Sequence, residues 1–243
     1  MSKPPGLIDF FDRTYIVNLP SRIDRKNETI EEFNRYEFPI NNNKCDFFSA
    51  IKPDDTGGFP NIGTRGCFLS HLAIIESAIQ TNLETILIIE DDIYFSRKIH
   101  KYTQDALDGL NKLEWDIAYL GHPLGDDQKK PSWKLLDQPM MMSHFYALNA
   151  KTFKKLAKFL RAVENRPLGD PEGGPMHYDG ALNFYREKHP EVNAYYFSKN
   201  LGWQRPSKTD IHENSFLDRY HLLKPATKII RNLKTRFAKE YRF

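Results

Sequence analysis

The sequence of 243 residues contains only two cysteines, Cys45 and Cys67, which is a poor basis for a disulfide framework in a chain of this length. It also has no apolar run close to the roughly 18 residues that cross a membrane. The first residues contain no apolar segment of the kind found in signal peptides. We therefore expect reduced thiols and a cytoplasmic protein, with peripheral contact at the inner face of a membrane left open.

The two commonest phosphate-binding motifs are also missing. No Gly-x-Gly-x-x-Gly follows the first apolar segment, and no Gly-Lys-Ser/Thr of the Walker type occurs in the chain. This excludes an ordinary dinucleotide-binding fold and a P-loop. A phosphate-bearing ligand would have to be held by a metal ion and by arginine side chains instead.

A strong positive charge is absent from the body of the chain. The formal net charge is +3, yet residues 221–243 hold seven of the 35 basic residues and one of the 32 acidic residues. The remaining chain therefore has 28 basic and 31 acidic residues. A slightly acidic body is unsuited to binding polyanions, so we expect no nucleic-acid partner.

The basic residues of 221–243 alternate with apolar residues at helical spacing, which predicts a basic amphipathic helix. Such a helix can lie on an anionic membrane surface, where a lipid-linked acceptor would be found. It can equally pack on the body of the protein with its basic face in water. The sequence leaves both interpretations open and predicts a body over 1–220 followed by this helix over 221–243.

The body itself shows a regular alternation of apolar strands and amphipathic helices. Strands are predicted over residues 14–19, 44–50, 86–89, 115–120, 144–148 and 194–197, and helices over 22–36, 66–80, 101–113, 150–161 and 178–188. This βαβ rhythm predicts an α/β fold with a mostly parallel sheet flanked by helices. Residues 199–220 are expected to be irregular.

The segment Thr85–Ile93 is a β-branched apolar strand that ends in three consecutive acids, Glu90, Asp91 and Asp92. Ligands of open α/β sheets collect beyond the carboxyl ends of such strands. Three carboxylates there repel one another unless a cation joins them, and oxygen ligands suit Mn²⁺ or Mg²⁺. Alternation of side chains places Glu90 and Asp92 on one face and Asp91 on the other. The simpler interpretation is that the acids cap a helix or lie in water.

Five blocks follow one another along the chain: Tyr15-Ile16-Val17-Asn18-Leu19-x-x-Arg22-x-x-Arg25, Gly63-x-x-Gly66-Cys67-x-x-Ser70-His71, Ile88-Ile89-Glu90-Asp91-Asp92, Tyr178-Asp179-Gly180-Ala181-Leu182 and Gln204–Ile211. In this order and spacing they resemble the signatures of glycosyltransferase family 25, which comprises lipopolysaccharide-type β-galactosyltransferases and collagen-modifying relatives. The resemblance covers most of residues 13–211. It implies a GT-A fold, a nucleotide-diphospho-sugar donor and transfer with inversion at the anomeric carbon. One departure is Thr64-Arg65, where we expect family members often to carry an acid.

The resemblance also implies roles for individual residues. Asp92 and Glu90 would bind the metal ion, Mn²⁺ or Mg²⁺, and the donor would be contacted by Leu19, Arg22, Arg25, Ser70, His71 and Asp91. The simpler interpretations are that the arginines are solvated residues at a helix start and that His71 is a core histidine. Cys67 is expected to pack, because the sequence supplies no paired histidine that would make it a nucleophile.

An inverting transfer needs a base that takes the proton of the acceptor hydroxyl. Asp179 follows a loop rich in glycine and proline and precedes a predicted helix, so it could enter the site from the acceptor side. The alternative is that Asp179 caps a helix that begins at Gly180. Further candidates for sugar stacking or metal binding are Trp133, Trp203, His122 and His212.

The predicted function is a metal-dependent inverting glycosyltransferase that moves a hexose, most simply galactose from its uridine diphosphate conjugate, to a glycan or lipid-linked glycan. Two alternatives stay open. One is a non-catalytic module of the same fold that binds glycans or nucleotide sugars. The other is a metal-dependent phosphohydrolase of nucleotide sugars, which would release nucleotide without an acceptor.

Overall fold

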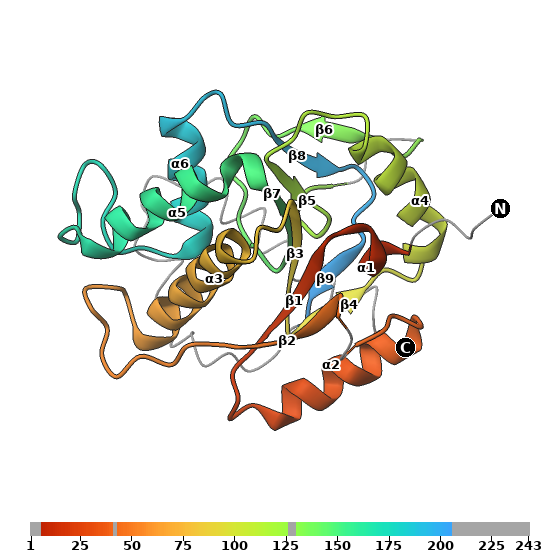
Figure 1. Ribbon diagram of the computed structural model, residues 1–243, viewed down its shortest axis with the longest axis horizontal. Helices are drawn as coiled ribbons and strands as arrows, with labels where there is room; N and C mark the ends of the chain where they lie inside the picture. Colours follow the sequence, from red (N-terminus) through yellow and green to blue (C-terminus); the bar gives the residue numbers. More distant parts are fainter. Residues whose placement is uncertain (1–5, 41–42, 126–129, 206–243) are drawn as a thin grey trace. The chain divides into compact units, whose positions relative to one another are not determined.

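The computed structural model describes residues 6–40, 43–125 and 130–205 (Figure 1). The chain divides into two compact units, Met1–Ser207 and Lys208–Phe243, and all described residues belong to the first. The predicted basic helix over 221–243 and His212 lie outside the described residues. The predicted boundary at residue 220 therefore stays a prediction.

Within the described residues, a seven-stranded sheet forms the centre of the first unit (Figure 1). Across the sheet the strands are β2 (Cys45–Ser49), β1 (Arg13–Asn18), β3 (Thr85–Glu90), β7 (Phe145–Asn149), β5 (Ile117–Tyr119), β8 (Ala194–Phe197) and β6 (Trp133–Leu135). Strands β7 and β6 run opposite to the other five. The predicted α/β fold with a mostly parallel sheet and flanking helices is confirmed.

Helices cover both faces of this sheet (Figure 1). Helices α3 (Ile62–Gln80), α5 (Ala150–Asn165) and α6 (Tyr178–Lys188) pack on one face and contact one another. Helices α1 (Leu7–Phe10), α2 (Ile23–Arg35) and α4 (Ile99–Leu110) contribute to the core on the other face. The sheet therefore separates two hydrophobic cores.

The composition of β3 explains its central place. Ile86 and Ile88 are buried in the core beneath α3, and Leu87 and Ile89 are buried in the opposite core. Each fully buried aliphatic side chain contributes about 1.5–3 kcal/mol, so both faces of β3 fix its register. Glu90 continues the row of Ile86 and Ile88, and the register therefore directs it toward α3.

Every predicted strand and helix of the body forms, but some short elements carry no sequence signal. These are α1, β6, β4 (Ile93–Phe95) and β9 (Gly202–Gln204). Each has only three or four residues and, unlike β5 and β8, does not stand out from its neighbours as an apolar segment. The expectation that residues 199–220 are irregular is wrong at β9, which pairs antiparallel with β4 and sets Gln204 opposite Ile93.

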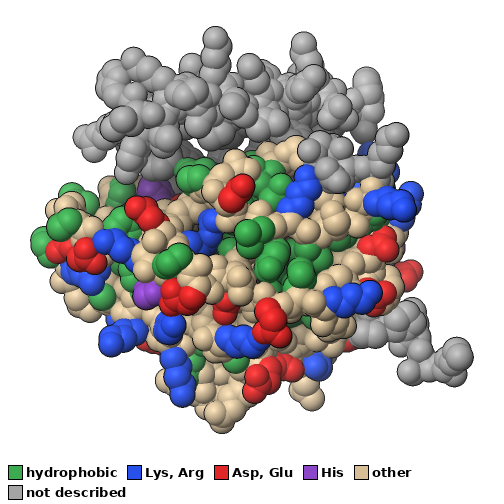
Figure 2. Space-filling model, turned by 90° about the horizontal axis from the view of Figure 1, so that it is seen from above, with side chains coloured by type: hydrophobic (Ala, Val, Ile, Leu, Met, Phe, Trp, Pro, Cys, Tyr) green, Lys and Arg blue, Asp and Glu red, His purple; other side chains and the backbone are tan. Residues whose placement is uncertain are grey.

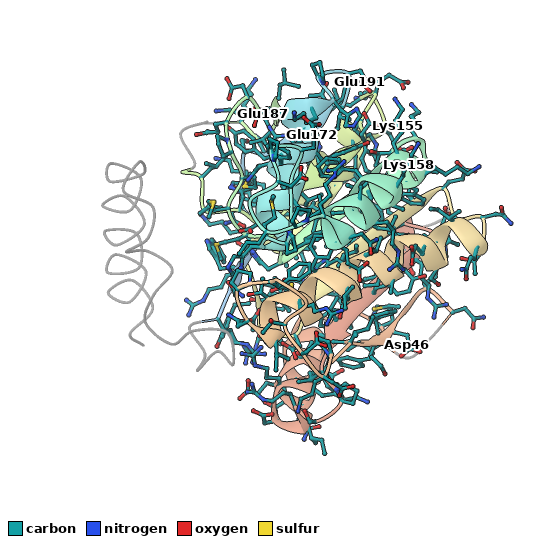
Figure 3. The ribbon with its side chains drawn as sticks, turned by 90° about the vertical axis from the view of Figure 1, so that its left-hand side faces the viewer. Asp46, Lys155, Lys158, Glu172, Glu187 and Glu191 are labelled. Atoms are coloured by element: carbon teal, nitrogen blue, oxygen red, sulfur yellow. The ribbon has the colours of Figure 1, made fainter. Side chains whose placement is uncertain are left out.

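The surface of the first unit carries charges of both signs, and basic and acidic side chains are interspersed over the face in Figure 2. Beside α5 and α6, Lys155 lies 2.9 Å from Glu191 and Lys188 lies 2.8 Å from Glu172 (Figure 3). Exposed pairs of this kind contribute about 1 kcal/mol or less. Among the described helices, none combines the length and apolarity needed to span a membrane.

Candidate active site

The acidic residues at the end of β3 form a turn before β4. Asp91 is 5% exposed, and its carboxylate accepts hydrogen bonds from Asn18 Nδ2 of β1 at 2.7 Å and from Arg25 Nη1 of α2 at 3.0 Å. Its backbone N–H donates to Val17 O at 3.1 Å. Because Val17 and Asn18 end β1, Asp91 joins two neighbouring strand ends to α2.

The backbone of this acidic turn is held from two further directions. Thr29 Oγ1 and Arg205 Nη2 each donate to the carbonyl oxygen of Asp91 at 2.6 Å. The N–H of Arg205 donates to Asp92 O at 2.6 Å, and its guanidinium lies 2.8 Å from Glu28. These bonds fix the directions in which the acidic side chains point.

The carboxylate of Asp92 is satisfied on one side only. Its Oδ2 accepts from Gln204 Nε2 at 3.0 Å and lies 3.7 Å from Arg25 Nη1. Its Oδ1 is buried and finds no hydrogen-bond partner within the described part of the chain. Burial and the neighbouring charge of Glu90 raise the pKa of Asp92 to about 7, because a carboxylate removed from water favours its neutral form.

Glu90 points to the α3 side of the sheet, as strand alternation predicts. Its Oε2 accepts from the same Gln204 Nε2 at 3.3 Å, and its Oε1 lies 3.6 Å from His71 Nε2. Burial raises the pKa of Glu90 to about 7, and nearby carboxylate charges add to the shift. Glu90 and Asp92 are thus two carboxylates joined by one amide. This set of oxygen donors fits a hard divalent cation.

The motif Gly66-Cys67-x-x-Ser70-His71 on α3 presents two adjacent faces. On the first face, Ser70 Oγ donates to Gly66 O at 2.6 Å and accepts from the N–H of Ile51 at 2.8 Å. A Cβ at Gly66 would lie 2.5 Å from Ile51 O, so the close approach requires glycine. This face anchors the segment after β2 to α3. The hydroxyl of Ser70, predicted to contact the donor, is engaged inside the protein.

On the second face of the motif, Cys67 and His71 point toward Glu90, and the three donor groups lie within 4.8 Å of one another. Cys67 packs against the core, as expected, but the stated reason, that no histidine is paired with it, is wrong, since the i, i+4 spacing brings His71 beside it. His71 is fully buried and its ring stacks on Tyr178 with centroids 4.3 Å apart. Burial lowers the pKa of His71 to about 3, so the ring is neutral.

Asp179 lies in the first turn of α6, whose cap residue is His177. The alternative in which Asp179 caps a helix starting at Gly180 is therefore wrong. Its carboxylate accepts from the N–H of Gly180 at 2.8 Å and from the N–H of Met142 at 3.1 Å. Met142 has a φ of 85°, a strained value for a residue with a side chain. The charge of Asp179 also contributes to the raised pKa of Glu90.

A cavity of about 360 Å³ opens between β1, β2 and α2, lined by Asn18, Pro20, Ile23, Lys26, Asn27, Phe47, Phe48 and Ser49. It adjoins the acidic turn, because Asn18 also binds Asp91. The predicted donor residues Leu19 and Arg22 belong to the same β1–α2 connection, where the N–H of Arg22 donates to Leu19 O at 2.8 Å. The Arg22 guanidinium lies 2.8 Å from Asp24.

Two other predicted residues are engaged in the core. Trp133 Nε1 donates to Ala106 O at 2.8 Å, and its ring packs on Phe197 with centroids 5.3 Å apart. His122 Nε2 bonds Phe197 O at 2.7 Å. Trp133 is therefore partly buried and packs against the core, with its N–H already engaged. Trp203 lies on β9 opposite Tyr94.

Asn18 and Arg205 lie within two of the blocks that carry the family resemblance, but the sequence does not mark them as partners of the acidic turn, and Thr29 lies in none of the blocks. Polar residues of these types are common at strand ends and on helix surfaces. Gln204 begins the last of the blocks that carry the family resemblance. That block is the one signal that could have pointed to it.

The chain is similar to proteins of known family. Residues 61–202 match the model described as Glycosyltransferase family 25 (LPS biosynthesis protein). Procollagen galactosyltransferase 2 of Mus musculus is 24% identical over 211 residues, which cover 79% of this chain and 33% of that protein. The inactive glycosyltransferase 25 family member 3 of Homo sapiens is 24% identical over 220 residues, which cover 82% of this chain and 36% of that protein.

Among solved structures, a glycosyltransferase involved in the glycosylation of the major capsid of PBCV-1 matches 81% of this chain and 93% of that chain, with 10% identity and a TM-score of 0.48. The chain spans about a third of the length of the two curated relatives.

Proposed function

This chain belongs to glycosyltransferase family 25, and we propose that it transfers a hexose from a nucleotide-diphospho-sugar to a glycan acceptor with inversion. We propose galactose carried on uridine diphosphate as the donor, because a similar protein is named a procollagen galactosyltransferase. The observation that carries the proposal is the pair of carboxylates, Glu90 and Asp92, at the end of a central strand and beside a cavity.

In this proposal Asp92 and Glu90 hold a divalent ion, Mn²⁺ or Mg²⁺. The buried Asp92 Oδ1 lacks a hydrogen-bond partner among the described residues, and both carboxylates have pKa values raised to about 7, so a cation would stabilise both. When bound, the ion would neutralise charge on the leaving diphosphate. Arg25 adds positive charge, since its Nη1 lies 3.0 Å from Asp91 and 3.7 Å from Asp92.

The cavity between β1, β2 and α2 is the proposed nucleotide site. Phe47 and Phe48 line it, and aromatic side chains are suited to contact a base. Lys26, whose Nζ lies 5.0 Å from the centre of the Phe47 ring, adds a positive charge for the phosphates. Because Asn18 lines the cavity and binds Asp91, a base in the cavity would bring the diphosphate to the acidic turn.

Asp179 is the proposed base. Its carboxylate would accept the proton of the acceptor hydroxyl as that oxygen attacks the anomeric carbon. The bond from this carbon to the diphosphate breaks on the opposite face, and the diphosphate leaves with the electron pair. Hydrogen bonds from the N–H groups of Gly180 and Met142 orient the carboxylate. The effect of its charge on the pKa of Glu90 supports a place near the donor sugar.

A second candidate is a module that binds a nucleotide sugar without transferring it. One similar protein is named an inactive family member. In addition, the ion pair between Arg25 and Asp91 neutralises part of the acidic turn without a metal ion. Such a module would keep the nucleotide cavity and would have no need of Asp179.

Thermal shift and nucleotide release test these candidates together. UDP-galactose with Mn²⁺ should raise the Tm more than other UDP-sugars, and excess chelator should remove the effect. Nucleotide release that requires added glycan supports the transferase. A Tm rise with no release favours the binding module, and release without glycan favours the phosphohydrolase. The variant Asp92→Asn removes one of the two proposed metal ligands. Its control is Asp55→Asn, at an exposed residue that pairs with Arg65 outside the acidic turn.

A further inference from the structure

Three donor groups of different chemistry meet between α3 and the end of β3. The thiol of Cys67, the imidazole of His71 and the carboxylate of Glu90 each have a ligand atom within 4.8 Å of the other two. The helix places Cys67 and His71 on one face because they are four residues apart. The strand register places Glu90 opposite that face, in line with the buried side chains of Ile86 and Ile88.

The hydrogen bonds of His71 leave one ring nitrogen available as a ligand. Tyr146 OH donates to Tyr178 OH at 2.8 Å, so the single proton of Tyr146 is used in that bond. The oxygen of Tyr146 therefore accepts from His71 Nδ1–H, also at 2.8 Å. In this tautomer Nε2 carries a lone pair.

The Nε2 atom of His71 points into the cluster. No hydrogen bond from the described residues uses its lone pair. It is buried and finds no hydrogen-bond partner in the described residues, and it lies 3.6 Å from Glu90 Oε1. A metal-binding histidine in general donates its other ring N–H to an oxygen, which fixes the tautomer and the ring orientation. Tyr146 is in the position to do this for His71.

The cluster is closed on one side and accessible on another. His71 is fully buried, whereas Cys67 and Glu90 are partly exposed. Three protein ligands and an open fourth position is the arrangement of zinc sites that keep a place for water or substrate. Partial exposure of two ligands gives the ion a path of entry.

We propose that Cys67, His71 and Glu90 form a binding site for a borderline transition-metal ion such as Zn²⁺, adjacent to the hard-cation site at Asp92 and sharing Glu90 with it. Sulfur and nitrogen donors select Zn²⁺ or Co²⁺ over Mg²⁺. Glu90 presents Oε1 to this cluster and Oε2 to Gln204, so the two sites lie on different sides of one carboxylate. The Cys67 thiol is protonated without metal, because burial raises its pKa, and binding releases that proton to solvent. The site does not depend on the transferase activity proposed above.

Cobalt is the probe, because thiolate ligation gives Co²⁺ a near-ultraviolet charge-transfer band that oxygen and nitrogen ligands do not. The metal-free protein, kept reduced with a phosphine, is titrated with Co²⁺. We expect the band to saturate at one ion per chain and to be bleached by Zn²⁺. Cys67→Ser should abolish the band, and Cys45→Ser, at a cysteine buried in β2, should leave it unchanged.

Two further variants test whether the Co²⁺ band comes from this cluster and not from neighbouring groups. Tyr146→Phe removes the oxygen that holds His71 Nδ1–H, so Co²⁺ affinity should fall about 10–100-fold while the band is kept. Asp92→Asn should retain the band, because Asp92 is not one of the three ligands. Absence of the band in the wild type, its persistence in Cys67→Ser, or its loss in Asp92→Asn would overturn the proposal. A melting curve in chelator checks that each variant is folded.

Discussion

At the acidic turn, burial opposes the charges of Glu90 and Asp92, which share the Gln204 amide. Because folding raises the pKa of each to about 7, the folded protein binds more protons than the unfolded chain between about pH 4 and pH 7. The contribution of these two groups to the stability of the metal-free protein is therefore fully present only at low pH. It is lost as the pH rises toward 7.

Asp92→Asn should remove much of this loss. In chelator, we expect the Tm of the variant to exceed that of the wild type, by more at pH 8 than at pH 5, while Mn²⁺-dependent transfer is abolished. Melting curves at the two pH values measure the difference. A Tm gain that is the same at both pH values, or a Tm below that of the wild type at pH 8, would contradict a strained buried carboxylate.

Asp179→Asn tests the base. An asparagine side chain has one acceptor oxygen, so it keeps one of the two bonds from the N–H groups of Met142 and Gly180, and the backbone bonds of α6 should hold the start of the helix. Without a proton acceptor, kcat should fall about 10²–10⁴-fold, while donor binding changes little. Steady-state kinetics with the donor varied separates the two effects. An unchanged kcat, or a loss confined to the Tm, would assign Asp179 a structural role only.

At this scale the sequence identifies the acids but not most of their partners. Three consecutive carboxylates after a buried strand are a local pattern, and Glu90, Asp91 and Asp92 are visible for that reason. Gln204 and Arg205 reach the same turn from more than 110 residues further along the chain. Contacts over such separations depend on strand pairing, which leaves no periodic trace in either segment.

Among the elements, α3 joins the segment after β2 to the site, and Gly66 is where the approach is closest. Gly66→Ala would bring a Cβ to 2.5 Å from Ile51 O, which forces the backbone apart. We expect a loss of about 1–3 kcal/mol, typical of overpacking, seen as a lower Tm. Gly180→Ala in α6 is the matched control, because its Cβ would meet Met176 Sδ at 3.7 Å and alanine favours a helix. Equal effects at both positions would refute the packing argument.

The long elements are predictable because they repeat a burial pattern several times. The helix α3 has 19 residues and buries apolar residues at helical spacing, and β3 has six residues, of which the four central apolar side chains are all buried. Strands β4, β6 and β9 have three residues each, and their positions are decided by partners elsewhere in the chain. The cavity between β1, β2 and α2 likewise depends on which side chains of β2 and α2 face each other. The order of strands and helices expected from the sequence does not determine which side chains these are.

For the whole molecule, the uneven distribution of charge along the sequence leads to a prediction about binding to anionic membranes. Residues 221–243 carry seven basic residues and one acid, whereas the body is slightly acidic. Deleting residues 222–243 should sharply reduce binding to anionic vesicles, since each Lys or Arg near such a surface contributes about 1 kcal/mol. Salt should weaken vesicle binding of the full chain as well.

Transfer to a small water-soluble acceptor should survive this deletion, because the acidic turn, the cavity and Asp179 all lie before residue 206. Vesicle flotation and a transfer assay measure the two properties on the same preparations. Vesicle binding that is unaffected by the deletion, or a truncated protein that melts far lower, would exclude the membrane interpretation of residues 221–243.

The pairing of β4 with β9 has a consequence for the order in which the protein is made. Asp92 leaves the ribosome 112 residues before the Gln204 that binds it. A nascent chain that ends between Asp92 and Gly202 contains every carboxylate of the acidic turn but lacks the Gln204 amide and the bonds from Arg205 that help to hold it. Since domains fold as units during synthesis, the acidic turn is completed only when the last strand of the unit has emerged. A chain that ends after Asp92 and before Gly202 therefore carries all three acids without the Gln204 amide that joins Glu90 to Asp92.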